Sequence, residues 1–294
     1  MKAIIFPSIL AVFAVGTSFR GTQQEISAIQ ALKNGWIKVD LIGKGGHSGS
    51  CVKLDVQNLK RSPLKIRFNP GNLLNSKINS EQDLLIAKEQ EVILAENQKR
   101  SADLKAYCCQ SQNIVPQFGS SFKLTNHGSD KIHKLTKFMN ALKLPDNIIQ
   151  SAVWSVSNDA PVSNISYFQS DSKVPGIKRN VDSLRNFVCK LTGRANPWFS
   201  TPQQRVITTQ RMVASSPVEV FGSISYELKE NSRLHYELLN PNGQLIYSNL
   251  GEQEMSKGKW DYNFSLKVSG YPKGEYLVRI KTDQNLITEQ KFII

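Results

Sequence analysis

The sequence predicts a mainly β protein with a helical insert, in the order N-terminal antiparallel β-sandwich, helical unit and C-terminal β-sandwich. Three observations predict this order. Short runs of alternating apolar and polar residues fill the first part of the chain, helical spacing follows, and alternating runs return after Pro217. The chain is long enough for two or three modest cores of this kind.

Residues 1–18 have the pattern of a cleaved secretory signal peptide. Lys2 gives a positive start, an apolar stretch runs from Ala3 to Val15, and small residues follow at 16–18. The stretch is shorter than the roughly 20 apolar residues that cross a bilayer. We therefore expect an exported chain without a transmembrane span.

Residues 19–125 contain short strand-like runs. The predicted strands are 36–41, 51–56, 64–68, 84–87, 92–94 and 104–109. Turn-forming residues separate them, as at 43–49 and 69–71. Runs of this length and spacing predict an antiparallel sandwich in which each sheet buries one face.

The apolar spacing becomes helical in residues 126–193. The stripes lie in 131–142, in a helix opened by Pro145 and Asp146, and in 181–191. We expect these helices to form a unit that packs on the first sandwich.

Residues 194–215 contain prolines and many Ser, Thr and Gln residues, which predicts a linker. Strand-like runs then return in 216–294, where Asn-Pro-Asn-Gly at 240–243 predicts a hairpin turn.

Three segments of this last part carry a family resemblance. They are the hairpin 239–247, the segment 274–280 and the terminal 291–294. The pattern resembles the C-terminal sandwich of proteins exported by the bacterial type IX secretion system, and related immunoglobulin-like modules. The resemblance implies an immunoglobulin-like β-sandwich and a secreted protein, located at the cell surface or in the periplasm.

The chain is basic, and its basic side chains are unevenly distributed. The net charge is +13, whereas residues 216–294 carry 9 basic and 10 acidic side chains. The densest basic run comprises Lys173, Lys178, Arg179, Arg185, Lys190 and Arg194. Such a field favours an anionic surface polymer as partner, although a solvated face without a ligand gives the same pattern. Another envelope protein is the alternative partner, and the absence of a nucleic-acid-binding motif predicts no specific nucleic acid.

Four cysteines follow the predicted signal peptide, namely Cys51, Cys108, Cys109 and Cys189. In an oxidising compartment they can form up to two disulfides, in any of three pairings. Cys108 and Cys109 are adjacent in a predicted strand, so their side chains should point to opposite faces. The cysteine spacings and the scattered histidines predict no metal site.

A second interpretation of the cysteines comes from Ile149-Gln150-Ser151-Ala152-Val153-Trp154, on a predicted helix downstream of Tyr107-Cys108-Cys109. This segment resembles the thioester domains of bacterial surface adhesins. In that family a cysteine thiol and a glutamine carboxamide condense with loss of ammonia, and the buried product acylates an amine on the target. The resemblance implies Gln150 as the acyl partner and Cys108 or Cys109 as the thiol donor. An ordinary apolar helix face with disulfide cysteines accounts for the same residues.

The sequence lacks the signatures of common enzymes. The Gly-rich stretch 43–50 does not fit the phosphate-loop pattern and precedes a strand, so we interpret it as a turn. G-x-S-x-G and H-E-x-x-H are absent, and carboxylates are sparse in the middle region. We predict no catalytic residues and no cofactor, although a site assembled from distant residues leaves no motif.

Three functions fit these observations. The first is a non-catalytic adhesion, binding or scaffolding role for an exported cell-surface or envelope protein. The second is a covalent adhesin with a Cys–Gln thioester, and the third is a secreted hydrolase. The sequence favours the first, because periodicity alone accounts for the helix that carries Gln150.

Overall fold

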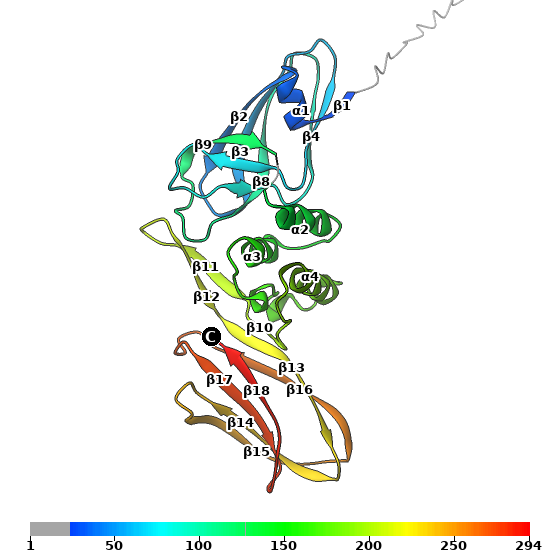
Figure 1. The fold of residues 1–294 in the computed structure, drawn as a ribbon, viewed down its shortest axis with the longest axis vertical. Coiled ribbons are helices and arrows are strands. Elements are labelled where there is room, and N and C mark those ends of the chain that lie inside the picture. Colours follow the sequence, from blue (N-terminus) through cyan, green and yellow to red (C-terminus); the bar gives the residue numbers. More distant parts are fainter. Residues whose placement is uncertain (1–23, 127) are drawn as a thin grey trace, which may run out of the picture.

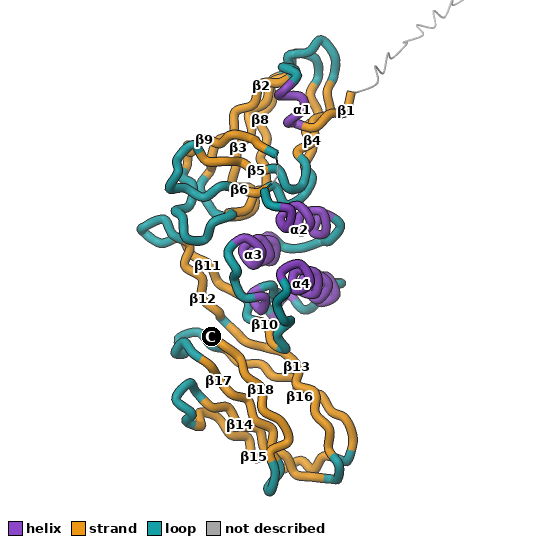
Figure 2. Tube along the Cα trace, in the orientation of Figure 1, coloured by secondary structure: helices purple, strands orange, loops and turns teal. Residues whose placement is uncertain are grey.

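The computed structural model describes residues 24–126 and 128–294, and the predicted signal peptide lies outside them. A strand-rich N-terminal part, three helices and a C-terminal β-sandwich follow one another along the molecule (Figure 1). Colouring by secondary structure shows the same succession (Figure 2). The predicted fold class, mainly β with a helical insert, is confirmed.

Six strands of the N-terminal part close into an antiparallel barrel. In order around the barrel they are β2 (Ile37–Lys44), β3 (Ser48–Asn58), β8 (Lys99–Cys108), β6 (Leu84–Leu85), β5 (Leu73–Ser76) and β9 (Phe118–Thr125). Along β3 the side chains of Val52, Leu54 and Val56 are buried. Such alternate inward positions fill the interior of a small barrel.

A three-stranded sheet shares the core of the barrel. It consists of β1 (Gln24–Ser27), β4 (Leu64–Phe68) and β7 (Gln90–Leu94), with β1 parallel to β4. Leu64, Ile66 and Phe68 are fully buried in this core. Helix α1 (Ala28–Lys33) follows β1 and begins where the Ser27 hydroxyl accepts a hydrogen bond from the Gln30 N–H.

The N-terminal strands therefore do not form the predicted sandwich of two facing sheets: six of them close into a barrel, and three form a separate sheet. Alternation predicts which face of a strand is buried, but it does not predict the neighbour of that strand. Here the long β3 pairs with both β2 and β8, with an irregularity between Gly49 and Val52. Irregularities of this kind bend a strand, and the short β5 and β6 complete the closure between β8 and β9.

Three helices pack against one end of the barrel. They are α2 (Asp130–Asn140), α3 (Asp146–Ser157) and α4 (Ile177–Thr192), with short 3₁₀ turns η1 (Val162–Asn164) and η2 (Gln169–Asp171) before α4. Their shared core includes Tyr107 and Cys109 from the end of β8. Phe138 of α2 stacks on Phe187 of α4, with ring centroids 4.1 Å apart. In the described part of the chain, no helix has the length and apolar character needed to cross a membrane.

Residues 203–217 form a two-stranded hairpin, which we call the arm. Its strands are β11 (Gln203–Ile207) and β12 (Val213–Pro217), and the short β10 (Phe199–Ser200) precedes them. The arm runs beside the helices toward the barrel (Figure 1). The prediction of a linker at 194–215 needs correction, because the polar residues there are engaged: Thr201 is buried, and its hydroxyl lies 2.9 Å from that of Ser163.

The tip of the arm is fastened to the barrel by Arg211. Its Nη2 donates to Glu81 Oε1 at 2.7 Å and to the Val115 carbonyl at 2.6 Å. The Val115 N–H returns a bond to the Arg211 carbonyl at 2.7 Å. The Glu81 side chain is fully buried and also accepts from the Ser120 hydroxyl. The arm thus carries the counter-ion of a buried carboxylate.

Arg211→Ala should destabilise the protein by about 2 kcal/mol, because it leaves the Glu81 carboxylate buried without its cation. Denaturant unfolding of both proteins measures the difference. Arg61→Ala is the control, since Arg61 is exposed and should change stability by less than about 0.5 kcal/mol. Equal effects of the two substitutions would contradict this role for the arm tip.

The C-terminal part is a sandwich of two sheets, in the orders β10-β13-β16 and β15-β14-β17-β18. The strands are β13 (Glu219–Leu228), β14 (Ser232–Leu239), β15 (Leu245–Met255), β16 (Gly258–Lys267), β17 (Glu275–Lys281) and β18 (Leu286–Ile293). Val220 from one sheet and Tyr276 and Phe292 from the other share one core, as the sandwich prediction requires. The predicted hairpin is present: Asn240 Oδ1 accepts from two backbone N–H groups of the turn, and Gly243 has a φ of 76°.

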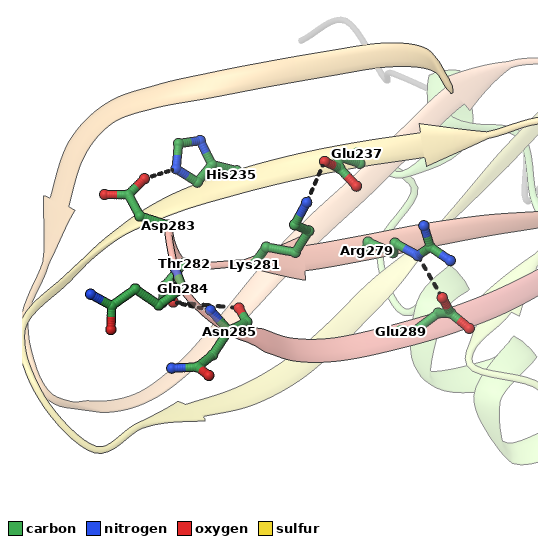
Figure 3. A network of polar contacts seen from close by, with 9 residues as sticks. All are labelled: His235, Glu237, Arg279, Lys281, Thr282, Asp283, Gln284, Asn285 and Glu289. Atoms are coloured by element: carbon green, nitrogen blue, oxygen red, sulfur yellow. Dashed lines mark hydrogen bonds and ion pairs between the residues drawn. The ribbon is translucent and has the colours of Figure 1, made fainter. Parts of the chain in front are cut away.

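Cross-strand ion pairs lie along β14, β17 and β18 of this sandwich (Figure 3). They are Glu237–Lys281 at 2.8 Å and Arg279–Glu289 at 2.6 Å, and a ring nitrogen of His235 is hydrogen-bonded to Asp283 nearby. Residues 282–285 form the turn between β17 and β18, where the Thr282 hydroxyl accepts from the Asn285 N–H. Partly exposed pairs of this kind contribute up to about 1 kcal/mol each, so they support strand register.

Candidate functional site

Cys108 and Gln150, which are far apart in the sequence, meet where β8 ends against α3. Gln150 Nε2 donates to the Cys108 carbonyl at 2.8 Å, and the Cys108 N–H donates to Gln150 Oε1 at 3.1 Å. Both residues are fully buried. The carboxamide is therefore held at the backbone of one of the two cysteines that the sequence proposed as its partner.

Cys108 is the last residue of β8, and Gln150 lies near the start of α3. Helix α3 starts at Asp146 after Pro145, so Gln150 lies in its second turn. The Tyr107 hydroxyl donates to Asp146 Oδ1 at 2.7 Å, which ties the start of α3 to the end of β8. Gly49 has a φ of 76°, which favours glycine, and a Cβ at this position would lie 2.9 Å from Asp146 Oδ2 and would displace that carboxylate.

The two adjacent cysteines lie in different cores. The Cys108 side chain packs in the barrel core, together with Cys51 and Trp154. Cys109 packs in the helical core with residues such as Ile149. Trp154 lies four residues after Gln150 and therefore on the same side of α3. The Cys108 side chain thus packs against the barrel-facing side of α3, the side on which Gln150 also lies.

The buried thiols are held in the protonated form. Burial, followed by the neighbouring Cys51 and Cys109, raises the pKa of Cys108 well above its usual value. Burial raises the pKa of Cys109 to about 12 and that of Cys51 to about 11. Since the thiolate is the reactive species, these cysteines are shielded from external thiol reagents at neutral pH.

The predicted disulfides are not formed. Cys51, Cys108, Cys109 and Cys189 are all free. Cys108 and Cys109 face different cores, and Cys189 is half-buried on α4. No disulfide therefore connects the helices to the barrel, and the hydrogen bonds between the end of β8 and α3 make that connection.

Two further side chains, which the sequence did not single out for this site, cover Trp154. The His47 ring is stacked on the indole, with centroids 6.2 Å apart, and the Arg205 guanidinium carbon lies 5.2 Å from the ring centre. The His47 carbonyl also accepts from the Cys108 N–H at 3.0 Å. Burial, and then the charge of Arg205, lower the pKa of His47 to about 4, so this imidazole is neutral at physiological pH. The glycine-rich stretch thus forms the turn that was predicted, and that turn also contributes to the site.

The predicted anion-binding run is divided by the fold. Lys173, Lys178, Arg179 and Lys190 are exposed. Arg185 is buried and donates to Ser200 Oγ and to the Pro197 and Phe199 carbonyls. Arg194 donates to the carbonyls of Ala160 and Ser155. The prediction is therefore corrected for Arg185 and Arg194, whose guanidinium groups hold the backbone.

Comparison with protein families decides the nature of the C-terminal part. Residues 216–294 match the model of the secretion system C-terminal sorting domain. This is the sorting domain of type IX secretion, so the chain is an exported protein of the cell surface. The predicted localisation is confirmed, and the sorting domain coincides with the sandwich that follows the arm.

Comparison with solved structures gives only weak likenesses. Red sea bream transglutaminase shares 8% identity at a TM-score of 0.22, over 90% of this chain and 32% of its own. A β-glucosidase from Kluyveromyces marxianus shares 10% identity at a TM-score of 0.21, over 83% of this chain and 44% of its own. The β-glucosidase DesR from Streptomyces venezuelae shares 9% identity at a TM-score of 0.18, over 88% of this chain and 48% of its own. This chain thus spans less than half the length of each, and likenesses this weak carry no information on its activity. A search of curated proteins found no match.

Proposed function

We propose that this surface protein is an adhesin that attaches covalently, through an internal thioester between Cys108 and Gln150. The observation that carries the proposal is the double hydrogen bond between the fully buried Gln150 carboxamide and the Cys108 backbone. Any buried side-chain amide needs hydrogen-bond partners, whether or not it has a chemical role. Here its partner is also one of the two cysteines named by the resemblance to thioester domains, and that agreement ranks this function above a non-covalent role.

The chemistry of the proposed bond is an acyl exchange. The Cys108 sulfur adds to the carboxamide carbon of Gln150, the carbon–nitrogen bond breaks, and the thiol proton leaves with the amide nitrogen as ammonia. The Cys108 N–H donates to Gln150 Oε1, where negative charge develops during the addition, so it stabilises that step. A target amine then forms an amide with the acyl carbon, and the released sulfur takes up a proton.

The surroundings suit a reactive acyl group that must survive export. Cys108 and Gln150 are fully buried, and Trp154 packs beside Cys108 in the same core. Burial keeps water from the acyl carbon until a target amine arrives. Cys108 is also free of any disulfide, as a thiol donor must be.

Thiol counting tests the proposal and separates it from disulfide formation. Four cysteines are present, so a thioester leaves one fewer titratable thiol in the denatured protein. Hydroxylamine, which cleaves thioesters, should restore that thiol, whereas a disulfide reductant should not. Recovery of all four thiols before hydroxylamine would contradict the proposal.

We also propose that the exposed basic residues assist the approach to an anionic surface polymer. Substituting Lys173, Arg179 and Lys190 together by Gln should weaken retention on an acidic polysaccharide, and added salt should weaken it for the parent protein, because salt screens exposed charges. The control replaces Lys257, Lys259 and Lys273 of the sorting domain. Equal retention of both triple variants, or retention that is indifferent to salt, would contradict an electrostatic role for the run.

A further inference from the structure

The arm brings a half-buried arginine onto the helix that carries Gln150. Arg205 of β11 donates through Nη1 to the Asn147 carbonyl at 3.2 Å and through Nη2 to Ser151 Oγ at 2.6 Å. Its guanidinium also lies over Trp154. One side chain of the arm thus contacts the first three turns of α3.

The residues that Arg205 contacts surround Gln150 along the helix. Asn147, Ser151 and Trp154 lie three residues before, one after and four after Gln150. With 3.6 residues per turn these four positions form one stripe. Any movement of this stripe changes the distance between the carboxamide carbon and the sulfur of Cys108.

The charge of Arg205 has no carboxylate partner within ion-pair distance among residues 24–126 and 128–294. Its Nε is buried and makes no hydrogen bond to the described residues. Even partial burial of a cation without a counter-ion is costly, and packing alone would be served better by an apolar residue. The arm itself is fixed independently, through Arg211 and Glu81. These facts indicate a role for Arg205 beyond holding the arm.

We infer that Arg205 is a positioning residue of the Cys108–Gln150 site, so that the site is complete only when the arm has docked. This inference rests on the proposed thioester. Arg205 fixes the helix stripe that presents the carboxamide and covers Trp154 against water, and its positive charge lies on the side of α3 where negative charge develops during acyl exchange. Because β12 leads directly into β13 of the sorting domain, formation of the thioester is coupled to docking of the segment that joins the two parts.

The test follows thioester formation over time in full-length variants, by thiol counting with and without hydroxylamine. Arg205→Gln should slow formation on the order of 100-fold, the cost of a small misplacement of reacting groups. Arg205→Lys keeps the charge and one donor, and should restore part of the rate. Ser151→Ala removes the acceptor of Nη2, together with the bond from the Ser151 hydroxyl to the Asn147 carbonyl within α3. It should give a smaller loss, which keeps the test decisive if Arg205→Gln folds poorly.

Arg185→Gln is the matched control. Like Arg205, Arg185 donates to a serine hydroxyl and to backbone carbonyls, but it is more deeply buried and holds residues 197–200 against α4. This variant should lose stability and still form the thioester at the parent rate. Formation at the parent rate in Arg205→Gln and Ser151→Ala overturns the inference while leaving the proposed function intact. Absence of the thioester from the parent protein overturns both.

Discussion

Cys108→Ala and Gln150→Ala should each abolish covalent capture of methylamine, whereas Cys109→Ala should leave capture intact. This result is expected because Cys108 and Gln150 supply the two ends of the proposed bond, while Cys109 packs in the other core. Incubation with labelled methylamine followed by peptide mapping measures the adduct, which should lie on Gln150 of the parent protein.

The Cys109 variant is the matched control for this experiment. Cys108 and Cys109 are adjacent, are both buried and have raised pKa values, so a general effect of removing a buried thiol would appear in both variants. If Cys109→Ala loses capture and Cys108→Ala keeps it, the thiol partner of Gln150 is Cys109 and not Cys108. Capture by neither the parent nor the Cys109 variant would favour non-covalent adhesion.

Phe292→Ala should abolish display of the protein at the cell surface. Phe292 is fully buried in the sorting-domain core, where its ring stacks on Tyr276 with centroids 5.2 Å apart. Replacing a buried Phe by Ala costs about 3–5 kcal/mol, which approaches the whole stability of a domain of this size. Surface labelling of intact cells measures display, and thermal unfolding of the purified protein measures the stability loss.

Ile293→Ala is the control on the neighbouring residue. Ile293 is 63% exposed and its side chain points to the other face of β18, so the substitution should leave stability within about 0.5 kcal/mol. Normal display should accompany that stability. Loss of display in Ile293→Ala without loss of stability would mean that sorting depends on the exposed face of this strand rather than on its core.

Local pattern predicted the elements well and their pairing poorly. Strand β3 and helix α4 follow directly from apolar periods of two and of 3.6 residues. Closure of the barrel depends on which strands are neighbours, and β3, which ends at Asn58, pairs with β8, which begins only at Lys99. No local period encodes such a pairing, so the prediction of two facing sheets was as compatible with the sequence as the barrel.

The attachment of the arm could not be predicted from local composition either. Pro197 and Pro202 just before it and its own Ser, Thr and Gln residues are typical of a linker, and its strands carry little apolar alternation. Arg205 and Arg211 stabilise it through contacts with Trp154, Ser151 and Glu81. These partners lie far away in the sequence, so composition alone made the segment look unattached.

The candidate site was predicted in part. The segment around Gln150 and the cysteines before it named both ends of the proposed bond, and the fold brings Gln150 to Cys108. His47 and Arg205 were not predicted as neighbours of that bond. The sequence around His47 predicts only a turn, and nothing in the sequence connects Arg205 with α3.

The most direct measurement is the intact mass of the exported protein, purified without reductant or amine buffers. A thioester between Cys108 and Gln150 predicts a mass lower than that of the processed sequence by one ammonia, with a further gain of one methylamine after treatment with that amine. A mass equal to that of the processed sequence, unchanged by methylamine, would contradict the covalent attachment proposed for this protein.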